Sequence, residues 1–155
     1  MENQTETRRI GELLQNLYNG NPWLEVTLQT TLSGISAEQA AKKPGSMNSI
    51  WEITNHIISW RRNVLERVSG KTIITPEHNY FLPVTDTTES AWKQTLMDLQ
   101  ASQTEWNSFL NTMQDCKLDG IYSLNGHTHY EHIHGIIQHD AYHLGQIVLI
   151  AKHLV

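Results

Sequence analysis

The sequence predicts an all-α protein built as a bundle of four long helices. Apolar residues recur every three or four positions in four long segments, and no segment alternates between apolar and polar residues over a useful length. Two of the segments begin with a capping box, in which Ser or Thr is followed three residues later by Glu. Amphipathic helices bury their apolar stripes against one another, so four of them predict a four-helix bundle. Residues 1–155 show no internal repeat and are expected to form one domain.

The first helical segment is expected to span residues 5–32. Pro22 should kink or restart this helix, because proline has no backbone N–H to donate. The connection that follows is expected to contain a short helical turn at residues 36–40, Ser-Ala-Glu-Gln-Ala. The apolar positions of the segment are Ile10, Leu13, Leu14, Leu17, Trp23, Leu24, Leu28 and Leu32.

The second helix is expected to begin at the capping box Ser49-Ile50-Trp51-Glu52 and to end at Gly70. His56 lies on the flank of its apolar stripe, near the expected interior of the bundle. Arg61 and Arg62 are expected to be solvated on the surface, the alternative being that one of them faces an anionic ligand. The apolar stripe consists of Ile50, Ile53, Ile57, Trp60, Val64 and Val68.

Residues 70–86 form a long connection with two prolines and no helical period. Connections of this length in compact domains often act as lids or pocket walls. A third helix is expected over residues 87–114, where the polar Gln103 interrupts the apolar stripe. Gln103 is expected to bond a ligand imidazole, a metal-bound water or a backbone carbonyl. The apolar positions are Trp92, Leu96, Leu99, Trp106, Leu110 and Met113.

The fourth helix is expected to start at the capping box Thr128-His129-Tyr130-Glu131 and to run to the end of the chain. A short extended piece is expected before it, at residues 120–124. The apolar stripe of this helix consists of Ile133, Ile136, Ile137, Leu144, Ile147, Val148 and Ala151.

His139 and His143 lie four residues apart on this fourth helix. That spacing places them about 40° apart around the axis and roughly 6 Å apart along it, so both imidazoles reach one ion. Two ligands rarely suffice, and His56 on the second helix is the best third ligand. Together they would form a neutral nitrogen site with positions open to water or substrate. Alternatively, the pair arises by chance in a chain with nine histidines, and His56 is a hydrogen-bonded residue at the edge of the core.

The remaining histidines are assigned no ligand role. His132 lies about 10.5 Å from His139 along the helix, too far for the same ion but well placed to line a neighbouring pocket. Asp140 points away from His139 and is expected to hold a neighbouring helix. Tyr142 and Gln146 flank the ligand face and are expected to orient a bound group, unless the tyrosine packs in the core. The other histidines are His78, His127, His129, His134 and His153.

Composition restricts the partners and the compartment. The formal charge is −5 and basic residues form only isolated doublets, which argues against nucleic acid and anionic membranes as partners. No apolar run is long enough for a secretory signal or a membrane span. Cys116 is the only cysteine, so an internal disulfide is impossible and a cytoplasmic location is expected. A metal site would therefore use histidines and carboxylates.

Three stretches resemble one known family. Residues 49–70, "SIWEITNHIISWRRNVLERVSG", and 134–152, "HGIIQHDAYHLGQIVLIAK", are similar to the signature helices of the DinB-like (DinB/YfiT) superfamily. Residues 23–45 resemble the segment that precedes those helices. The resemblance implies a four-helix bundle of up-down-down-up order, with His56, His139 and His143 as ligands of zinc, nickel or iron. The resemblance also implies a homodimer. The family includes transferases and isomerases that use bacillithiol, mycothiol or glutathione.

These observations predict a metal-dependent enzyme that activates a thiol or a water. If it activates a thiol, a low-molecular-weight thiol would be the cosubstrate. Its small-molecule substrate is not indicated by the sequence. The alternative is a dimeric helical bundle that binds a metal or small molecule without turnover, related to stress. A third interpretation is a dimeric scaffold that binds metal incidentally. An open coordination position facing a pocket covered by residues 70–86 would favour the enzyme, and a fourth protein ligand would favour the binding protein.

Overall fold

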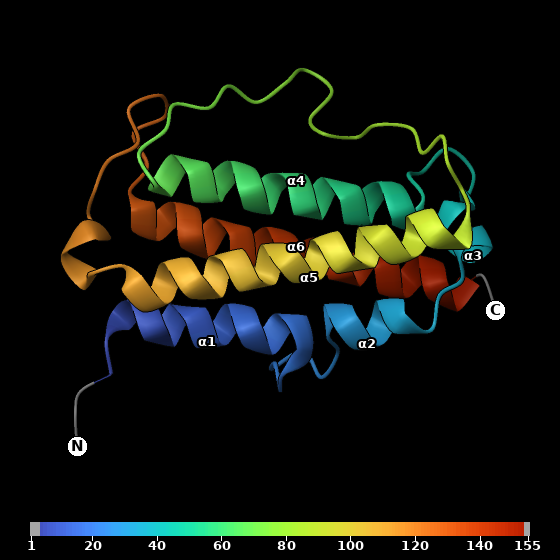
Figure 1. Cartoon of the computed structure of the whole chain (residues 1–155), viewed down its shortest axis with the longest axis horizontal. Helices are drawn as coiled ribbons and strands as arrows, with labels where there is room; N and C mark the ends of the chain where they lie inside the picture. Colours follow the sequence, from blue (N-terminus) through green and yellow to red (C-terminus); the bar gives the residue numbers. More distant parts are fainter. Residues whose placement is uncertain (1–3, 154–155) are drawn as a thin grey trace.

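The computed structural model describes residues 4–153, which form six α-helices and one 3-10 turn and contain an isolated Ile121–Thr128 bridge but no strand. The predicted all-α bundle is therefore confirmed (Figure 1). The long helices are α1 (Glu6–Asn19), α4 (Ile50–Val68), α5 (Glu89–Thr112) and α6 (His129–His153). The short elements are α2 (Leu28–Ser33), α3 (Ala37–Ala41) and the 3-10 turn η1 (Asp115–Lys117). No described helix is both long enough and apolar enough to span a membrane.

The long helices follow the up-down-down-up order that the resemblance implied. In Figure 1, α1 and α6 run from left to right, whereas α4 and α5 both run from right to left. Because α4 and α5 are parallel, the connection between them must return along the bundle, and a helix of 19 residues is about 28 Å long. The crossover, residues 69–88, therefore passes along the bundle beside α4 (Figure 1).

The predicted helix starts are confirmed by hydrogen bonds. The Ser49 hydroxyl accepts from the Glu52 N–H at 3.2 Å, and the Glu52 carboxylate accepts from the Ser49 N–H at 2.8 Å. Thr128 and Glu131 form the same reciprocal pair, at 3.0 and 2.7 Å. The predicted short turn is α3, which begins with a further capping box. Capping satisfies amide groups that the first helical turn leaves without partners, and it fixes where α4 and α6 begin.

The first predicted helix is two separate helices, and the gap between them is longer than a kink at Pro22 would produce. Helix α1 ends at Asn19, and helix α2 begins only at Leu28, after a turn in which Glu25 has a φ of 60°. The side chain of Thr27 then caps α2. Trp23, assigned to the apolar stripe, is 97% exposed, so that assignment is wrong. Its place in the stripe assumed helical backbone, which residues 20–27 lack.

The core consists of two apolar clusters, one toward each end of the bundle. The boundary falls at a polar residue on each of three helices, namely Arg61 on α4, Gln103 on α5 and Asp140 on α6. One cluster includes Leu17, Ile53, Ile57, Trp92, Leu99, Leu144 and Ile147. The other includes Ile10, Leu14, Val64, Val68, Trp106, Leu110, Ile133 and Ile136. The bundle therefore has a buried polar layer across its middle.

Candidate metal centre

The three predicted histidines meet at this middle level of the bundle. His56 comes from α4, and His139 and His143 come from successive turns of α6. One ring nitrogen from each residue lies within 4.8 Å of the other two, and the ring centroids are 4.4 to 5.0 Å apart. His56 and His143 are buried, and His139 is 22% exposed at its side chain. Two helices thus bring together residues that are 83 positions apart in the sequence.

Each imidazole is oriented through its Nδ1 atom. Nδ1 of His56 lies 2.7 Å from the backbone carbonyl of Asn79, and Nδ1 of His143 lies 2.7 Å from Oε1 of Gln146. Nδ1 of His139 lies 3.2 Å from Oδ1 of Asp140. An oxygen that can only accept assigns the proton to Nδ1, which leaves the Nε2 lone pair free. Oxygen acceptors behind ligand histidines are typical of metal sites.

The donor atoms fit a divalent cation. Nε2 of His56 and Nε2 of His139 are 3.0 Å apart, and with both protons on Nδ1 two lone pairs face each other at that distance. A cation between them removes this repulsion. Bonds of about 2.0–2.1 Å from two imidazoles to one ion place the nitrogens roughly 3 Å apart. Three imidazoles are a donor set suited to zinc, nickel or iron.

Burial keeps the imidazoles of His56 and His143 in the neutral form that binds metal. It lowers the pKa of His56 to about 4, with a further contribution from the neighbouring His143. Burial also lowers the pKa of His143, and the nearby His139 adds to the effect. Desolvation disfavours the charged form of a histidine, and a second imidazolium nearby disfavours it further. At neutral pH these two ligand positions therefore need not lose a proton before a cation binds.

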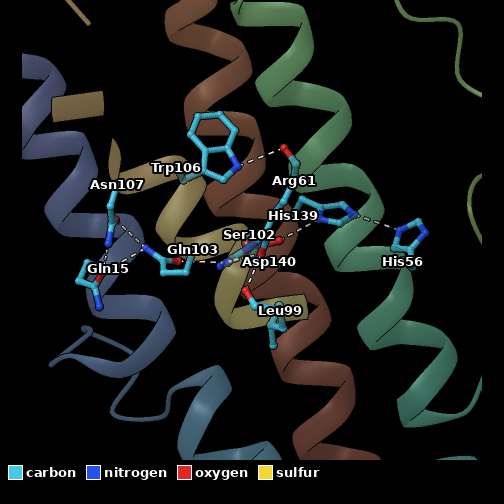
Figure 2. Close-up of polar contacts among 10 residues, drawn as sticks. All are labelled: Gln15, His56, Arg61, Leu99, Ser102, Gln103, Trp106, Asn107, His139 and Asp140. Atoms are coloured by element: carbon cyan, nitrogen blue, oxygen red, sulfur yellow. Dashed lines mark hydrogen bonds and ion pairs between the residues drawn. The ribbon is translucent and has the colours of Figure 1, made fainter. Parts of the chain in front are cut away.

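Asp140 connects the histidine cluster to the polar layer (Figure 2). One of its carboxylate oxygens bonds His139, and the other lies 2.6 Å from Nε of Arg61 on α4. Both side chains of this ion pair are completely buried. The prediction that Asp140 holds a neighbouring helix agrees with this contact. The expectation that Arg61 is a solvated surface residue is wrong, whereas Arg62 is exposed and lies 3.7 Å from Glu105.

The Gln103 side chain bonds Arg61, Asn107 and Gln15 and, within residues 4–153, contacts neither a histidine nor a backbone carbonyl by hydrogen bond. Its Oε1 accepts from Nη1 of Arg61 at 3.0 Å, and its Nε2 donates to Asn107 at 2.9 Å and to Gln15 of α1 at 3.3 Å. The backbone carbonyl of Arg61 also accepts from the indole N–H of Trp106 at 3.1 Å. Figure 2 shows this network running from α1 through α5 and α4 to His139. All four long helices thus contribute to the position of His139.

The histidine cluster forms part of the wall of a cavity of about 550 Å³. The crossover contributes Asn79 and Phe81, so the prediction that residues 70–86 supply a pocket wall is confirmed. The Phe81 ring stacks on the His56 ring at a centroid distance of 3.9 Å. Asn79 has a φ of 49°, and its side-chain oxygen accepts from the Trp60 indole at 3.0 Å. Tyr142 and Gln146 also line the cavity and bond each other at 3.1 Å.

The other sequence-derived residues lie outside this cluster. His132 is buried and lines a neighbouring cavity, as predicted, and His127 and His134 line the same one. His78 bonds the backbone of Tyr80 in the crossover. Cys116 is exposed in η1 and does not line the cavity beside the histidines.

One of three comparisons with known proteins identifies a family. No curated protein and no solved structure shows significant similarity to the chain. The family model of the DinB superfamily matches residues 24–147, well over half of the sequence. The matched region includes His56, His139 and His143, together with the crossover that covers them. The chain therefore belongs to the DinB superfamily.

Proposed function

We propose that His56, His139 and His143 bind a divalent cation and that the protein is a metal-dependent enzyme acting on a thiol or a water. The observation that carries this proposal is the convergence of three imidazoles on one cavity, each with an oxygen acceptor at its Nδ1. When bound, a divalent cation supplies a Lewis acid that lowers the pKa of a thiol or water at its remaining coordination position.

The number of ligands supports an enzyme over a binding protein. Within residues 4–153, no further His, Cys, Asp or Glu joins the group formed by the three histidines. Structural zinc sites usually have four protein ligands, whereas catalytic sites usually have three and an open position. The cavity provides space for a substrate beside the cluster.

The lining of the cavity favours a thiol as the nucleophile. Its described lining contains no Asp, Glu, Lys or Arg, so no carboxylate is available as a general base. A thiol has an ordinary pKa of about 8.5, against 15.7 for water, and so needs less help to ionise. Met47 and Phe81 offer polarisable and aromatic surface that suits sulfur. Because Cys116 lies elsewhere, the thiol must come from a cosubstrate.

The proposed transfer joins the thiol sulfur to an electrophilic carbon of the second substrate. The bond between that carbon and its leaving group breaks, and the leaving group takes the electron pair. The thiol proton passes to solvent. Asn79, Asp140 and Gln146 hold the three imidazoles in place during this exchange, since each supplies an acceptor to one ring.

Metal content tests the ligand assignment. Protein purified without a histidine tag is expected to hold about one divalent ion per chain in the wild type. His56→Ala and His143→Ala should lose most of it, because two neutral imidazoles bind far more weakly than three. The control is His153→Ala, which removes an exposed histidine from the end of α6. Wild-type metal content in both site variants would contradict the assignment.

Turnover tests the proposed chemistry. Cysteine, glutathione and bacillithiol are each offered with the electrophile 1-chloro-2,4-dinitrobenzene, and p-nitrophenyl acetate serves as the hydrolysis substrate. We expect zinc- or nickel-loaded protein to accelerate at least one thiol reaction and His143→Ala to lose the acceleration. Activity that survives complete removal of the metal would refute the metal-dependent mechanism. Stoichiometric metal without turnover in any arm would favour the binding protein.

A further inference from the structure

A second cavity, of about 640 Å³, lies beside the first, between the C-terminal half of α4 and the N-terminal half of α6. These two helix halves lie at the same end of the bundle in Figure 1. Its walls are partly apolar, from Val64 and Ile136, and partly aromatic, from Trp60 and Tyr130. The volume is in the range of pockets that hold small organic ligands, about 300–1,000 Å³. The proposed function makes no use of this cavity.

Three residues that line this cavity carry buried polar atoms without hydrogen-bond partners among residues 4–153. Arg67 and His132 are each 8% exposed, and neither Nε of Arg67 nor Nε2 of His132 has a hydrogen-bond partner. Nε2 of the neighbouring His134 is also buried and unpaired. Polar atoms in protein interiors are nearly always hydrogen-bonded, because leaving one unpaired costs about 1–3 kcal/mol. All three atoms belong to residues of one cavity wall, and the described part of the protein itself supplies none of them with a partner.

The part of the lining that the structure describes contains one arginine, Arg67, and one carboxylate, Glu131, and the two do not form an ion pair with each other. Among residues 4–153, no carboxylate lies within ion-pair distance of Arg67, in contrast to Arg61, which has Asp140. The rings of Trp60 and Tyr122 lie 5.4 and 5.2 Å from the Arg67 guanidinium and stabilise the cation. Nη2 of Arg67 donates to Thr75, but Nε still lacks an acceptor.

His132 is placed to act together with Arg67. Burial lowers the pKa of His132, and the positive charge of Arg67 lowers it further, so the imidazole is neutral at neutral pH. A neutral imidazole still donates one N–H, and the arginine donates from a planar guanidinium. A carboxylate accepts from both at once and brings the negative charge that the buried arginine lacks. Glu131 lines the cavity, but its carboxylate is engaged in the cap with Thr128.

We propose that this cavity binds a small organic carboxylate. Its carboxylate accepts hydrogen bonds from Arg67 and His132, and its apolar body lies between Trp60, Val64 and Ile136. The far end reaches Trp60 and His139, which line both cavities. A ligand in this position lies next to the three-histidine cluster, as a second substrate would. That role as a substrate rests on the proposed function, whereas the binding itself does not.

Binding is tested with 1-naphthoate, and with 1-naphthamide as its neutral counterpart, by isothermal titration calorimetry. We expect naphthoate to bind at least tenfold more tightly than naphthamide, because only the carboxylate forms charge-assisted hydrogen bonds. This preference should be the same in metal-free and zinc-loaded protein. The amide NMR signals of His132 and Gly135 are expected to shift on addition of naphthoate.

Two variants locate the binding site. Arg67→Met removes the charge and should weaken naphthoate binding at least tenfold while leaving naphthamide little changed. Gly135→Leu places an apolar side chain in the cavity and keeps the arginine, because Gly135 lines the cavity and a Cβ there meets no atom within 4 Å. It should abolish binding of both probes. Arg62→Met, on the same helix but outside the cavity, should bind like the wild type. Thermal unfolding and metal content are measured for every variant.

The proposal is overturned if naphthoate does not bind at millimolar concentration or binds no better than naphthamide. It is also overturned if a folded Gly135→Leu variant still binds, or if binding requires zinc and disappears in His143→Ala. The last result would place the carboxylate in the three-histidine cavity instead. If the histidine variants lose metal but bind naphthoate as the wild type does, the carboxylate site is supported. That result does not depend on which reaction the histidine cluster performs.

Discussion

Arg61 and Asp140 form a completely buried ion pair that joins α4 to α6 in the middle of the bundle, with Nε and Oδ2 2.6 Å apart. The second oxygen of Asp140 bonds the imidazole of His139. One carboxylate therefore neutralises a buried cation and orients a proposed metal ligand. Its two roles have separable consequences for stability and for metal affinity.

Asp140→Asn is expected to destabilise the fold and to weaken metal binding. Removing one member of a buried pair leaves the Arg61 charge uncompensated and typically costs about 3–5 kcal/mol of unfolding free energy. Losing the carboxylate behind a ligand histidine typically costs about 10–100-fold in metal affinity. Urea unfolding and zinc titration measure the two effects.

Two further variants separate those effects. Arg62→Ala, which disrupts only an exposed pair, should change the unfolding free energy by about 0.5 kcal/mol or less. Replacing both Arg61 and Asp140, by Met and Leu, should be less destabilising than Asp140→Asn alone, since no charge remains buried. The double variant should still bind zinc weakly. Wild-type zinc affinity in that variant would show that Asp140 does not support His139.

Gln146→Leu is expected to weaken zinc binding about tenfold with little change in the stability of the metal-free protein. Gln146 supplies the acceptor that orients His143, but it is only partly buried, so few other contacts depend on it. Gln94→Leu, an exposed glutamine on α5 that bonds Asp98, is the control. Equal zinc affinity in the two variants would argue against the assigned orientation of His143.

The metal-free protein should lose stability as the pH falls from about 6.5 toward 4. Burial lowers the pKa of His56 to about 4 in the folded state, whereas the unfolded chain keeps the ordinary value of about 6.5. The unfolded state therefore binds a proton across this window that the folded state does not, and acid favours unfolding. Urea unfolding at a series of pH values measures the loss.

His56→Asn is the reference for that pH series, because an amide can donate to the Asn79 carbonyl but does not titrate. The wild type should lose more stability than this variant between pH 6.5 and 4. Above about pH 7.5 the difference in unfolding free energy between the two proteins should no longer change with pH. Parallel curves over the whole range would mean that His56 keeps an ordinary pKa.

Ser49→Ala should lower the unfolding free energy by about 1 kcal/mol, within the usual 0.5–2 kcal/mol for loss of an N-cap. The hydroxyl of Ser49 is buried and accepts from the Glu52 amide, which has no other partner in the first turn of α4. Ser108→Ala, at an exposed site within α5, is the matched control and should be neutral or slightly stabilising. Equal effects of the two substitutions would contradict the assigned cap.

Homodimer formation, which the family resemblance implies, stays a prediction. Sedimentation equilibrium of the wild type is expected to give twice the chain mass at micromolar concentration. Trp23→Gln should raise the dissociation constant if the dimer buries this side chain, which is 97% exposed in the single chain. A monomer at all concentrations would contradict the prediction.

The sequence predicted the helices and the three histidines because both depend on spacing along the chain. The polar layer also follows from spacing along the chain. Arg61 lies four residues after Ile57 and three before Val64, and Asp140 lies four residues from both Ile136 and Leu144. Gln103 interrupts the apolar stripe of its helix. All three are polar residues at core positions, and together they indicate a buried network.

Other features of the site had no signal in the sequence. Pairing Gln103 with Arg61 requires knowing which helices face each other, and that follows from the packing of the whole bundle. The acceptor for His56 is the backbone carbonyl of Asn79, and every residue carries such a group. The exposure of Trp23 depends on a turn whose extent Pro22 alone does not determine.

The parallel direction of α4 and α5 has a consequence for how such a protein can diversify. The three imidazoles stand on helices that the core holds rigid, whereas one wall of their cavity belongs to the crossover. Surface connections tolerate changes of sequence and length far better than packed helices do. The crossover holds His56 through a main-chain oxygen, so that contact can persist whatever side chain occupies the position. Mutation can therefore alter what the cavity admits while the three imidazoles of the proposed cation site keep their positions.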